Sequence, residues 1–89
     1  MIIQLNKFGT TLTSRQDGKE AYNAFLATLQ SVPNDEEIEI DFAGVVTFTP
    51  SWADEFITPI FGTYGHRVKL LSTDNPSVEA TLRLLAKIK

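Results

Sequence analysis

Strict alternation between apolar and acidic residues at positions 38–42 constrains the fold more than any other feature of the chain. The segment reads Ile-Glu-Ile-Asp-Phe, so an extended backbone places three apolar side chains on one face and two carboxylates on the other. Positions 67–70, Arg-Val-Lys-Leu, repeat this alternation with basic residues. Strands that are covered on both faces read instead as continuous apolar runs. We therefore expect a sheet whose helices pack mainly on one face.

The charges on the polar faces of these two strands are opposite in sign. If the strands are neighbours, Glu39 and Asp41 lie beside Arg67 and Lys69. Exposed pairs of this kind contribute about 0.2–1 kcal/mol each, and so they favour one register more than they add stability.

Capping residues and apolar periodicity predict a first helix. Ser14 followed by Asp17 resembles a capping box, with Asp in place of the usual Glu, and opens a helix that runs to about Gln30. Gly18 lies early in this helix and weakens it slightly. The core-facing side chains recur at helical spacing: Tyr22, Phe25, Leu26 and Leu29.

A second helix is predicted to begin after Thr49, the candidate N-cap. Pro50 fixes φ and lacks an N–H group, which suits the first turn of a helix. Ser51 with Asp54 offers an alternative capping box. We expect Asp54 and Glu55 to lie in the first turn, where acidic groups favour the positive end of the helix dipole.

The end of the second helix and the start of a third are also marked in the sequence. Pro59 should kink or end the second helix because proline removes one internal hydrogen bond, and Gly65 suits a stop. Asn75 is the expected cap of the third helix, with Pro76 at its first position. The buried stripe of this helix is Val78, Leu82, Leu85 and Ile88.

The expected order of elements is strand, short strand, helix, strand, helix, strand, helix. The first strand begins at Ile2, and a Thr-rich strand at 10–13 follows a turn at 6–9. Connections between parallel strands are right-handed crossovers. We expect one α/β domain over residues 1–89, with about four strands in a single mixed sheet and three helices packed mainly on one face.

Composition and charge argue against several classes of function. The net charge of −3 has the wrong sign for a protein that binds nucleic acid or an anionic membrane. The absence of cysteine excludes a disulfide scaffold, a thiolate zinc site and a thiol nucleophile. No apolar run approaches about 18 residues, and the first residues lack the pattern of a signal peptide, so we expect a cytoplasmic protein.

A recognisable catalytic or metal-binding set is also missing. His66 is the one histidine, and nothing places it with Ser51 and an aspartate as a catalytic triad. One histidine without cysteine does not supply the three or four ligands of a zinc site. We therefore expect no catalytic residue, no metal and no cofactor, in a protein that is not an enzyme.

Two segments carry a family resemblance: positions 40–45, Ile-Asp-Phe-Ala-Gly-Val, and positions 51–56, Ser-Trp-Ala-Asp-Glu-Phe. They resemble the Asp-Phe-x-Gly-Val strand end and the Ser-aromatic-Ala-Asp-Glu helix start of a STAS-like family. That family comprises small bacterial and archaeal domains of unknown function. Phe8-Gly9 and the Leu-x-Ser-Arg of positions 12–15 also resemble its opening, so the resemblance covers most of the chain and implies a STAS-like fold.

The pattern is more distantly similar to sulfate-transporter and anti-sigma-factor-antagonist (STAS) domains. Those antagonists carry an Asp-Ser-Ser/Thr-Gly motif at the start of the corresponding helix, where a partner kinase of the GHKL ATPase class phosphorylates a serine. Aligning the strands puts Ser51 on the second hydroxyl position, with Trp52 in place of the Gly. Thr49 falls on the Asp and Pro50 on the first hydroxyl, so the chain keeps one hydroxyl of the motif.

This similarity implies a regulatory module of bacterial signalling or transcription control, which docks a GHKL-type ATPase or a histidine-kinase-like protein. Ser51 is the candidate phosphoacceptor. A phosphate there adds about −1.5 to −2 charges close to two carboxylates, which alters the docking surface more than the fold. The implied partner-binding residues lie at the start of the second helix: Thr49, Ser51, Trp52, Asp54 and Glu55. The oligomeric state is left open.

Several of these residues have alternative roles. Ser51 also suits a helix cap or a first-turn hydroxyl, and Trp52 suits either core packing or an exposed interface anchor. Ligands of open α/β sheets often bind beyond the carboxyl ends of the strands. Asp41 and Gly44 lie there, and they are candidates for binding a small molecule or nucleotide. Ordering the loop is the alternative role of Asp41.

Overall fold

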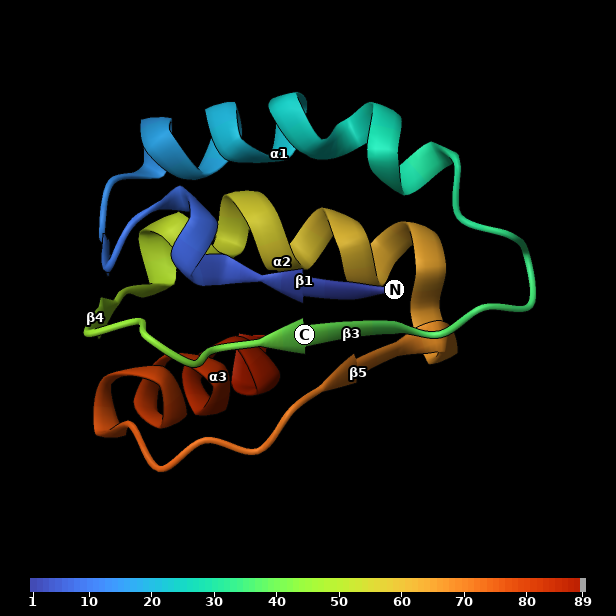
Figure 1. Cartoon of the computed structure of the whole chain (residues 1–89). Coiled ribbons are helices and arrows are strands. Elements are labelled where there is room, and N and C mark those ends of the chain that lie inside the picture. The colour runs from blue at the N-terminus through green and yellow to red at the C-terminus, as the bar shows by residue number, and fades with distance from the viewer. Residues whose placement is uncertain (89) are drawn as a thin grey trace.

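A sheet of three parallel strands organises the computed structural model, which describes residues 1–88 and the side chains through residue 86 (Figure 1). The strands are β1 (Ile2–Gln4), β3 (Ile38–Asp41) and β5 (Val68–Leu70), in the order β1-β3-β5. Glu39 of β3 stands opposite Lys69 of β5 in the register. The two strands with alternating charge are therefore neighbours, which is the condition set for pairing their charges.

The expectation that Arg67 lies beside the acidic residues of β3 is wrong. Arg67 belongs to the 3₁₀ helix η2 (Gly65–Arg67), which precedes β5. Its guanidinium donates hydrogen bonds to the carbonyl oxygens of Glu36 (3.1 Å) and Pro33 (2.8 Å). This side chain therefore ties together the turns that precede β3 and β5, and it does not pair across the sheet.

A second sheet of two short strands stands where the sequence predicts a fourth strand of one mixed sheet. β2 (Thr11–Leu12) pairs in parallel with β4 (Thr47–Phe48), so the described chain has two separate, wholly parallel sheets. The chain leaves the main sheet through the 3₁₀ helix η1 (Leu5–Phe8) and Gly9, whose φ of 127° favours glycine. β4 has only two residues, too few for a periodic pattern to reveal, and the expectation of one four-stranded sheet is wrong for this reason.

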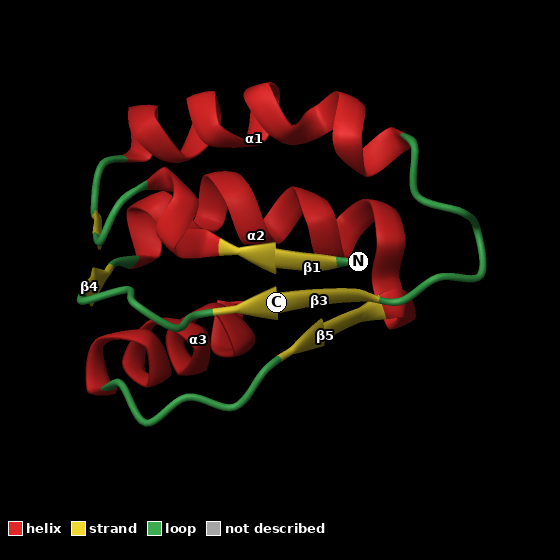
Figure 2. Cartoon of the chain, viewed as in Figure 1, coloured by secondary structure: helices red, strands yellow, loops and turns green. Residues whose placement is uncertain are grey.

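The helices lie where the capping signals predict them. α1 (Arg15–Gln30) follows β2, α2 (Pro50–Tyr64) follows β4, and α3 (Pro76–Ile88) follows β5. α2 does not end at Pro59 but continues to Tyr64, with Gly65 as its C-cap, since buried apolar residues on both sides of the proline hold the helix in place. α1 packs along α2, which in turn contacts α3 and β5 (Figure 2).

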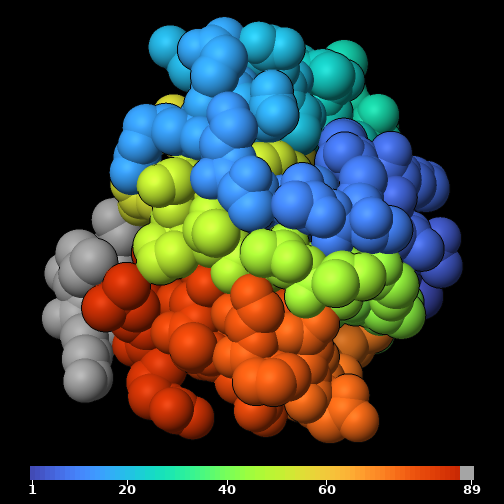
Figure 3. All heavy atoms as spheres, turned by 90° about the vertical axis from the view of Figure 1, so that its left-hand side faces the viewer, coloured from blue at the N-terminus to red at the C-terminus, as the bar shows by residue number. Residues whose placement is uncertain are grey.

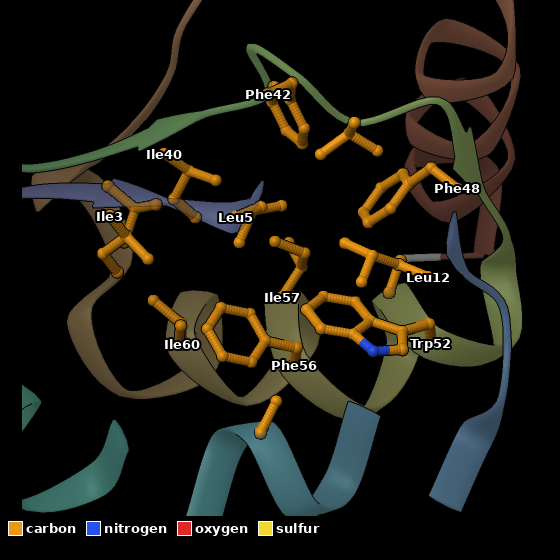
Figure 4. Packing of buried hydrophobic residues seen from close by; sticks show 14 of the residues in the cluster. Ile3, Leu5, Leu12, Ile40, Phe42, Phe48, Trp52, Phe56, Ile57 and Ile60 are labelled. Carbon is orange, nitrogen blue, oxygen red and sulfur yellow. The ribbon is translucent and has the colours of Figure 1, made fainter. Parts of the chain in front are cut away.

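The apolar faces of the strands meet the helices in one core (Figure 4). Ile3 of β1 and Ile40 of β3 are 1% and 0% exposed, whereas Ile2, on the opposite face of β1, is 54% exposed. The alternation in the sequence therefore corresponds to one covered and one open face, as predicted.

Hydrogen bonds anchor the start of α3 on β4. Asn75 caps α3 as predicted, because its Oδ1 accepts from the Ser77 N–H (2.8 Å). The hydroxyls of Ser77 (2.9 Å) and Thr81 (2.7 Å) both donate to the carbonyl oxygen of Phe48 in β4. Side chains of α3 thus provide hydrogen-bond partners for the backbone of β4 on the edge that faces away from β2. The side chain of Ile88, in the stripe predicted for α3, lies outside the described residues.

Candidate functional site

The starts of α1 and α2 lie side by side at one end of the molecule, which Figure 3 views directly. β2 leads into α1 and β4 leads into α2, so the pairing of these strands brings the two helix starts together. The Thr49 N–H donates to the carbonyl oxygen of Leu12 (3.1 Å), and Thr49 Oγ1 donates to that of Thr13 (2.8 Å). The helix-start surface, as we name it, consists of Arg15, Thr49, Ser51, Asp54 and Glu55.

A close approach of the two backbones fixes α1 against α2. A Cβ atom on Gly18 would lie 2.5 Å from the carbonyl oxygen of Trp52, a distance that real Cβ atoms do not adopt. In the sequence, Gly18 indicates only a slightly weaker helix. The structure shows why a glycine is needed at this position: without a side chain at Gly18, α2 can contact the backbone of α1.

Trp52 is a core residue, so its predicted role as an exposed partner contact is wrong. Its side chain is 1% exposed, and its ring stacks on that of Phe56 with the ring centres 4.9 Å apart (Figure 4). The rings of Phe48 and Phe8 lie 5.8 and 6.0 Å from it. Trp52 therefore supports the helix-start surface from below and takes no direct part in it.

Thr49 is the N-cap residue of α2, as predicted, but no side chain caps the helix. Its hydroxyl donates instead to the end of β2. Ser51 lies inside the first turn, so it forms no capping box with Asp54. α1 differs, because Ser14 Oγ accepts from the Asp17 N–H (3.1 Å) as predicted. The first turn of α2 is therefore left without a side-chain cap.

Ser51, the candidate phosphoacceptor, is half-buried, and its hydroxyl has no hydrogen-bond partner among the described residues. Asp54 and Glu55 follow at i+3 and i+4, so they are its neighbours on the helix surface. Both lie beyond the first turn, contrary to prediction, because α2 already begins at Pro50. The site thus combines a free hydroxyl with two carboxylates one turn away.

Arg15 pairs with both carboxylates, although the sequence did not single it out. Its Nη1 donates to Asp54 Oδ2 (3.1 Å) and to Glu55 Oε2 (2.7 Å). Hydrogen bonds to Glu55 and then to Asp54 raise the pKa of Arg15 above its ordinary value. Asp54 Oδ1 also accepts from Thr58 Oγ1 (2.9 Å). The signal for Arg15 is its place directly after the Ser14 cap, at the start of a helix that lies beside α2.

The carboxyl end of the main sheet carries a shallow hollow of about 470 Å³. Its lining residues are Asp41, Ala43, Ser72, Thr73 and Asp74. Asp41 Oδ1 accepts from the Ala43 N–H (3.0 Å), which is the loop-ordering role considered as its alternative. Gly44, the other predicted ligand-binding residue, does not line the hollow. Its φ is 84° and a Cβ there would lie 2.9 Å from Nδ2 of Asn6, so the turn itself requires glycine.

A groove of about 580 Å³ lies along the C-terminal halves of α2 and α3. We call it the apolar groove; its lining residues are Ile57, Thr58, Phe61, Gly62, Leu70, Leu82, Leu85 and Ala86. Phe61 and Leu70 are each 38% exposed. The sequence did not reveal this groove, since partly covered positions share the periodicity of the core stripes.

His66 and Ser51 lie too far apart to act together in catalysis. His66 belongs to η2, which follows the end of α2, whereas Ser51 lies in its first turn. The 15 residues of α2 span about 22 Å. Among the described side chains, no group of three or more His, Asp and Glu residues is placed to hold a metal ion. None of the described helices has the length and apolar character needed to cross a membrane.

The family of the chain follows from a comparison with known protein families. A family described as a STAS-like domain of unknown function (DUF4325) matches residues 17–78, more than half of the 89-residue chain. The chain belongs to this STAS-like family. The matched range includes β3, β4 and the start of α2, and it begins after Arg15. No curated protein and no solved structure matches the STAS-like domain.

Proposed function

We propose that the STAS-like domain is a non-catalytic regulatory module that docks a protein partner through the helix-start surface. By its distant similarity to anti-sigma factor antagonists, the partner is a GHKL-type ATPase or a histidine-kinase-like protein in bacterial signalling or transcription control. Such partners consume ATP, so we place the domain in the cytoplasm.

One observation carries this proposal: the backbone of the helix-start surface is fixed, while its polar side chains stay partly exposed. Thr49 is tied to β2, Gly18 admits α2 against α1, and Trp52 fills the core beneath. A surface that is already ordered loses less conformational entropy on binding. The hydroxyl of Ser51 and the carboxylates beside it are therefore presented in a defined arrangement.

We propose that Ser51 is the site of regulation. Its Oγ attacks the γ-phosphorus of ATP held by the partner, and the hydroxyl proton passes to a base of the partner. The bond from the γ-phosphorus to the bridging oxygen breaks, and ADP leaves. The new phosphate adds about −1.5 to −2 charges beside Asp54 and Glu55, so it alters the charge of the docking surface and thereby switches its affinity for the partner.

The experiment combines the purified domain with GHKL-type ATPases of the same organism, Mg²⁺ and ATP. We expect wild type to gain one phosphate by intact mass, and Ser51→Ala to gain none while still binding the ATPase in calorimetry. Ser72→Ala, an exposed hydroxyl at the sheet end, is the matched control and behaves as wild type. Equal phosphate uptake by wild type and Ser51→Ala removes Ser51 from the scheme. Failure of every ATPase to bind removes the docking function.

Small-molecule binding at the carboxyl end of the main sheet is the second candidate, favoured by the hollow there. The carboxylates of Asp41 and Asp74 make a polyol or an amine a better match than the phosphates of a nucleotide. Thermal unfolding with a polyol and amine panel, and with ATP, separates these classes. A ligand at about 100 times its Kd adds about 2.7 kcal/mol of stability. Loss of the effect in Asp41→Asn would support this site, and no effect from any compound would count against it.

A further inference from the structure

The two carboxylates of the helix-start surface differ in their freedom to bind a partner. Both oxygens of Asp54 accept hydrogen bonds, Oδ1 from Thr58 (2.9 Å) and Oδ2 from Arg15 (3.1 Å). Glu55 accepts from Arg15 through Oε2 (2.7 Å), and its Oε1 has no hydrogen-bond partner among the described residues. Asp54 is therefore the anchored carboxylate, and Glu55 is the one with an acceptor to offer.

Arg15 reaches both carboxylates from α1, but the contact is exposed to water. The side chain of Arg15 is 55% exposed, and those of Asp54 and Glu55 are 34% and 27% exposed. Exposed ion pairs add little stability, because water screens them and ordering long side chains costs entropy. The pairing of β2 with β4 and the hydrogen bonds of Thr49 hold the helix starts independently. Arg15 can therefore release Glu55 while the surface beneath stays folded.

The charges of this cluster favour a cationic partner group. Arg15 donates to both carboxylates, so Asp54 and Glu55 share one guanidinium. A further cation is attracted to this cluster, whereas a carboxylate or phosphate meets two negative groups around Arg15. The net charge of −3 over the whole chain adds a long-range attraction for a basic surface.

We infer that Glu55 binds a Lys or Arg side chain of the protein partner, and that Arg15 is an internal cation which this side chain displaces. The inference rests on the proposed docking function and gives it a chemistry, since the docking face of the partner is then basic. Asp54 keeps Arg15 close after displacement, because it binds the same Nη1 atom. Arg15 thus lowers the affinity for every partner, and only a well-placed cation overcomes the competition.

The first experiment uses the GHKL-type ATPase that binds the domain in the experiment above, and it measures the affinity of this ATPase for four variants at two salt concentrations. We expect Glu55→Gln to weaken binding about tenfold and to flatten the salt dependence. Arg15→Gln should tighten binding about threefold or more, because the competing cation is gone. Asp54→Asn should weaken binding less than Glu55→Gln does. Glu79→Gln, an exposed carboxylate on α3, is the matched control and leaves the affinity unchanged.

Two results would overturn the inference. If Arg15→Gln weakens binding as much as Glu55→Gln, then Arg15 itself contacts the partner. If Glu55→Gln binds the ATPase as tightly as Glu79→Gln does, then Glu55 binds no Lys or Arg side chain of the partner. Thermal unfolding of each variant shows that the comparison is made between folded proteins.

A second experiment needs no partner, so it separates failure of this inference from failure of the docking function. The probe is N-acetylarginine amide, titrated into ¹⁵N-labelled domain and followed by NMR, with N-acetylaspartate amide as the anionic control. We expect amide shifts around Glu55 that saturate at lower probe concentration in Arg15→Gln than in wild type, and that vanish in Glu55→Gln. Such shifts without any ATPase binding would leave the cation site standing and remove the docking function. If the ATPase binds but the probe shifts no amide in any variant, the docking function stands and the cation site at Glu55 is removed.

Discussion

The helix-start surface and the apolar groove lie at opposite ends of α2, and different kinds of interaction hold them. At the helix-start surface, directional contacts fix the backbone: the β2–β4 pairing, the hydrogen bonds of Thr49 and the close approach at Gly18. The apolar groove rests on side-chain packing, and Phe61 and Leu70 stay 38% exposed within it. Hydrogen bonds and a close backbone contact thus fix the helix-start surface, whereas the apolar groove keeps side chains that are only partly covered. Selective docking therefore fits the first region better than the second.

The largest effect expected from this comparison follows removal of the aromatic support of the helix-start surface. Trp52→Ala should lower the free energy of unfolding by about 3–5 kcal/mol, because it leaves a cavity in the stack with Phe56. Phe61→Ala in the apolar groove should cost clearly less, since that side chain is already 38% exposed. Urea unfolding of both variants makes the comparison. A stable Trp52→Ala variant that merely loses its partner would show Trp52 to be an interface residue after all.

The next largest effect concerns two helical glycines, one in each region. Gly18→Ala should destabilise the domain by about 1–3 kcal/mol, because the new Cβ would lie 2.5 Å from backbone of α2 and the helices must separate. Gly62→Ala, in the apolar groove, meets nothing within 4 Å and should stabilise α2 by up to about 1 kcal/mol. Melting temperatures of the two variants should therefore move in opposite directions. Equal shifts would mean that the helices are not in close contact at Gly18.

Local signals in the sequence predicted most of the elements. The alternation at 38–42 gave a strand with one covered face, and Ser14 and Asn75 cap helices as expected. These features depend on neighbours within a few residues along the chain. Periodicity and capping chemistry therefore suffice to recognise them.

Features that depend on distant partners were missed or misjudged. β2 and β4 have two residues each, and only their pairing across the chain makes them a sheet. Trp52 lies where a helix start and an aromatic cluster meet, so its burial depends on Phe8 and Phe48, which come from other elements. Arg15 joins the candidate site only because Gly18 brings α1 against α2. Neither the pattern nor the composition of a single segment contains that information.

A smaller effect is expected where α3 holds β4. Thr81 is 3% exposed and its hydroxyl donates to the Phe48 carbonyl oxygen (2.7 Å). Thr81→Val keeps the shape but removes this donor, so it should cost about 1 kcal/mol, with Ser77 still donating to the same oxygen. Thr58→Val loses a hydrogen bond that is more open to water, and it should cost less. Chemical denaturation of both variants tests whether the more buried hydrogen bond contributes more to the free energy of unfolding.

The smallest effect on stability should come from Arg15→Gln, the variant with a clear expected effect on binding. The ion pairs are exposed, so the melting temperature should change by no more than about 3 °C, and added salt should abolish the change. The pKa of Arg15 is raised by its hydrogen bonds to Glu55 and Asp54, so its contribution is complete below the ordinary pKa of arginine and is lost only as the pH rises through the raised value. The difference between variant and wild type should therefore stay constant between about pH 6 and 9. A difference that varies within this range would show that another titrating group holds the helix starts, and Arg15 could then not be a cation that leaves at little cost.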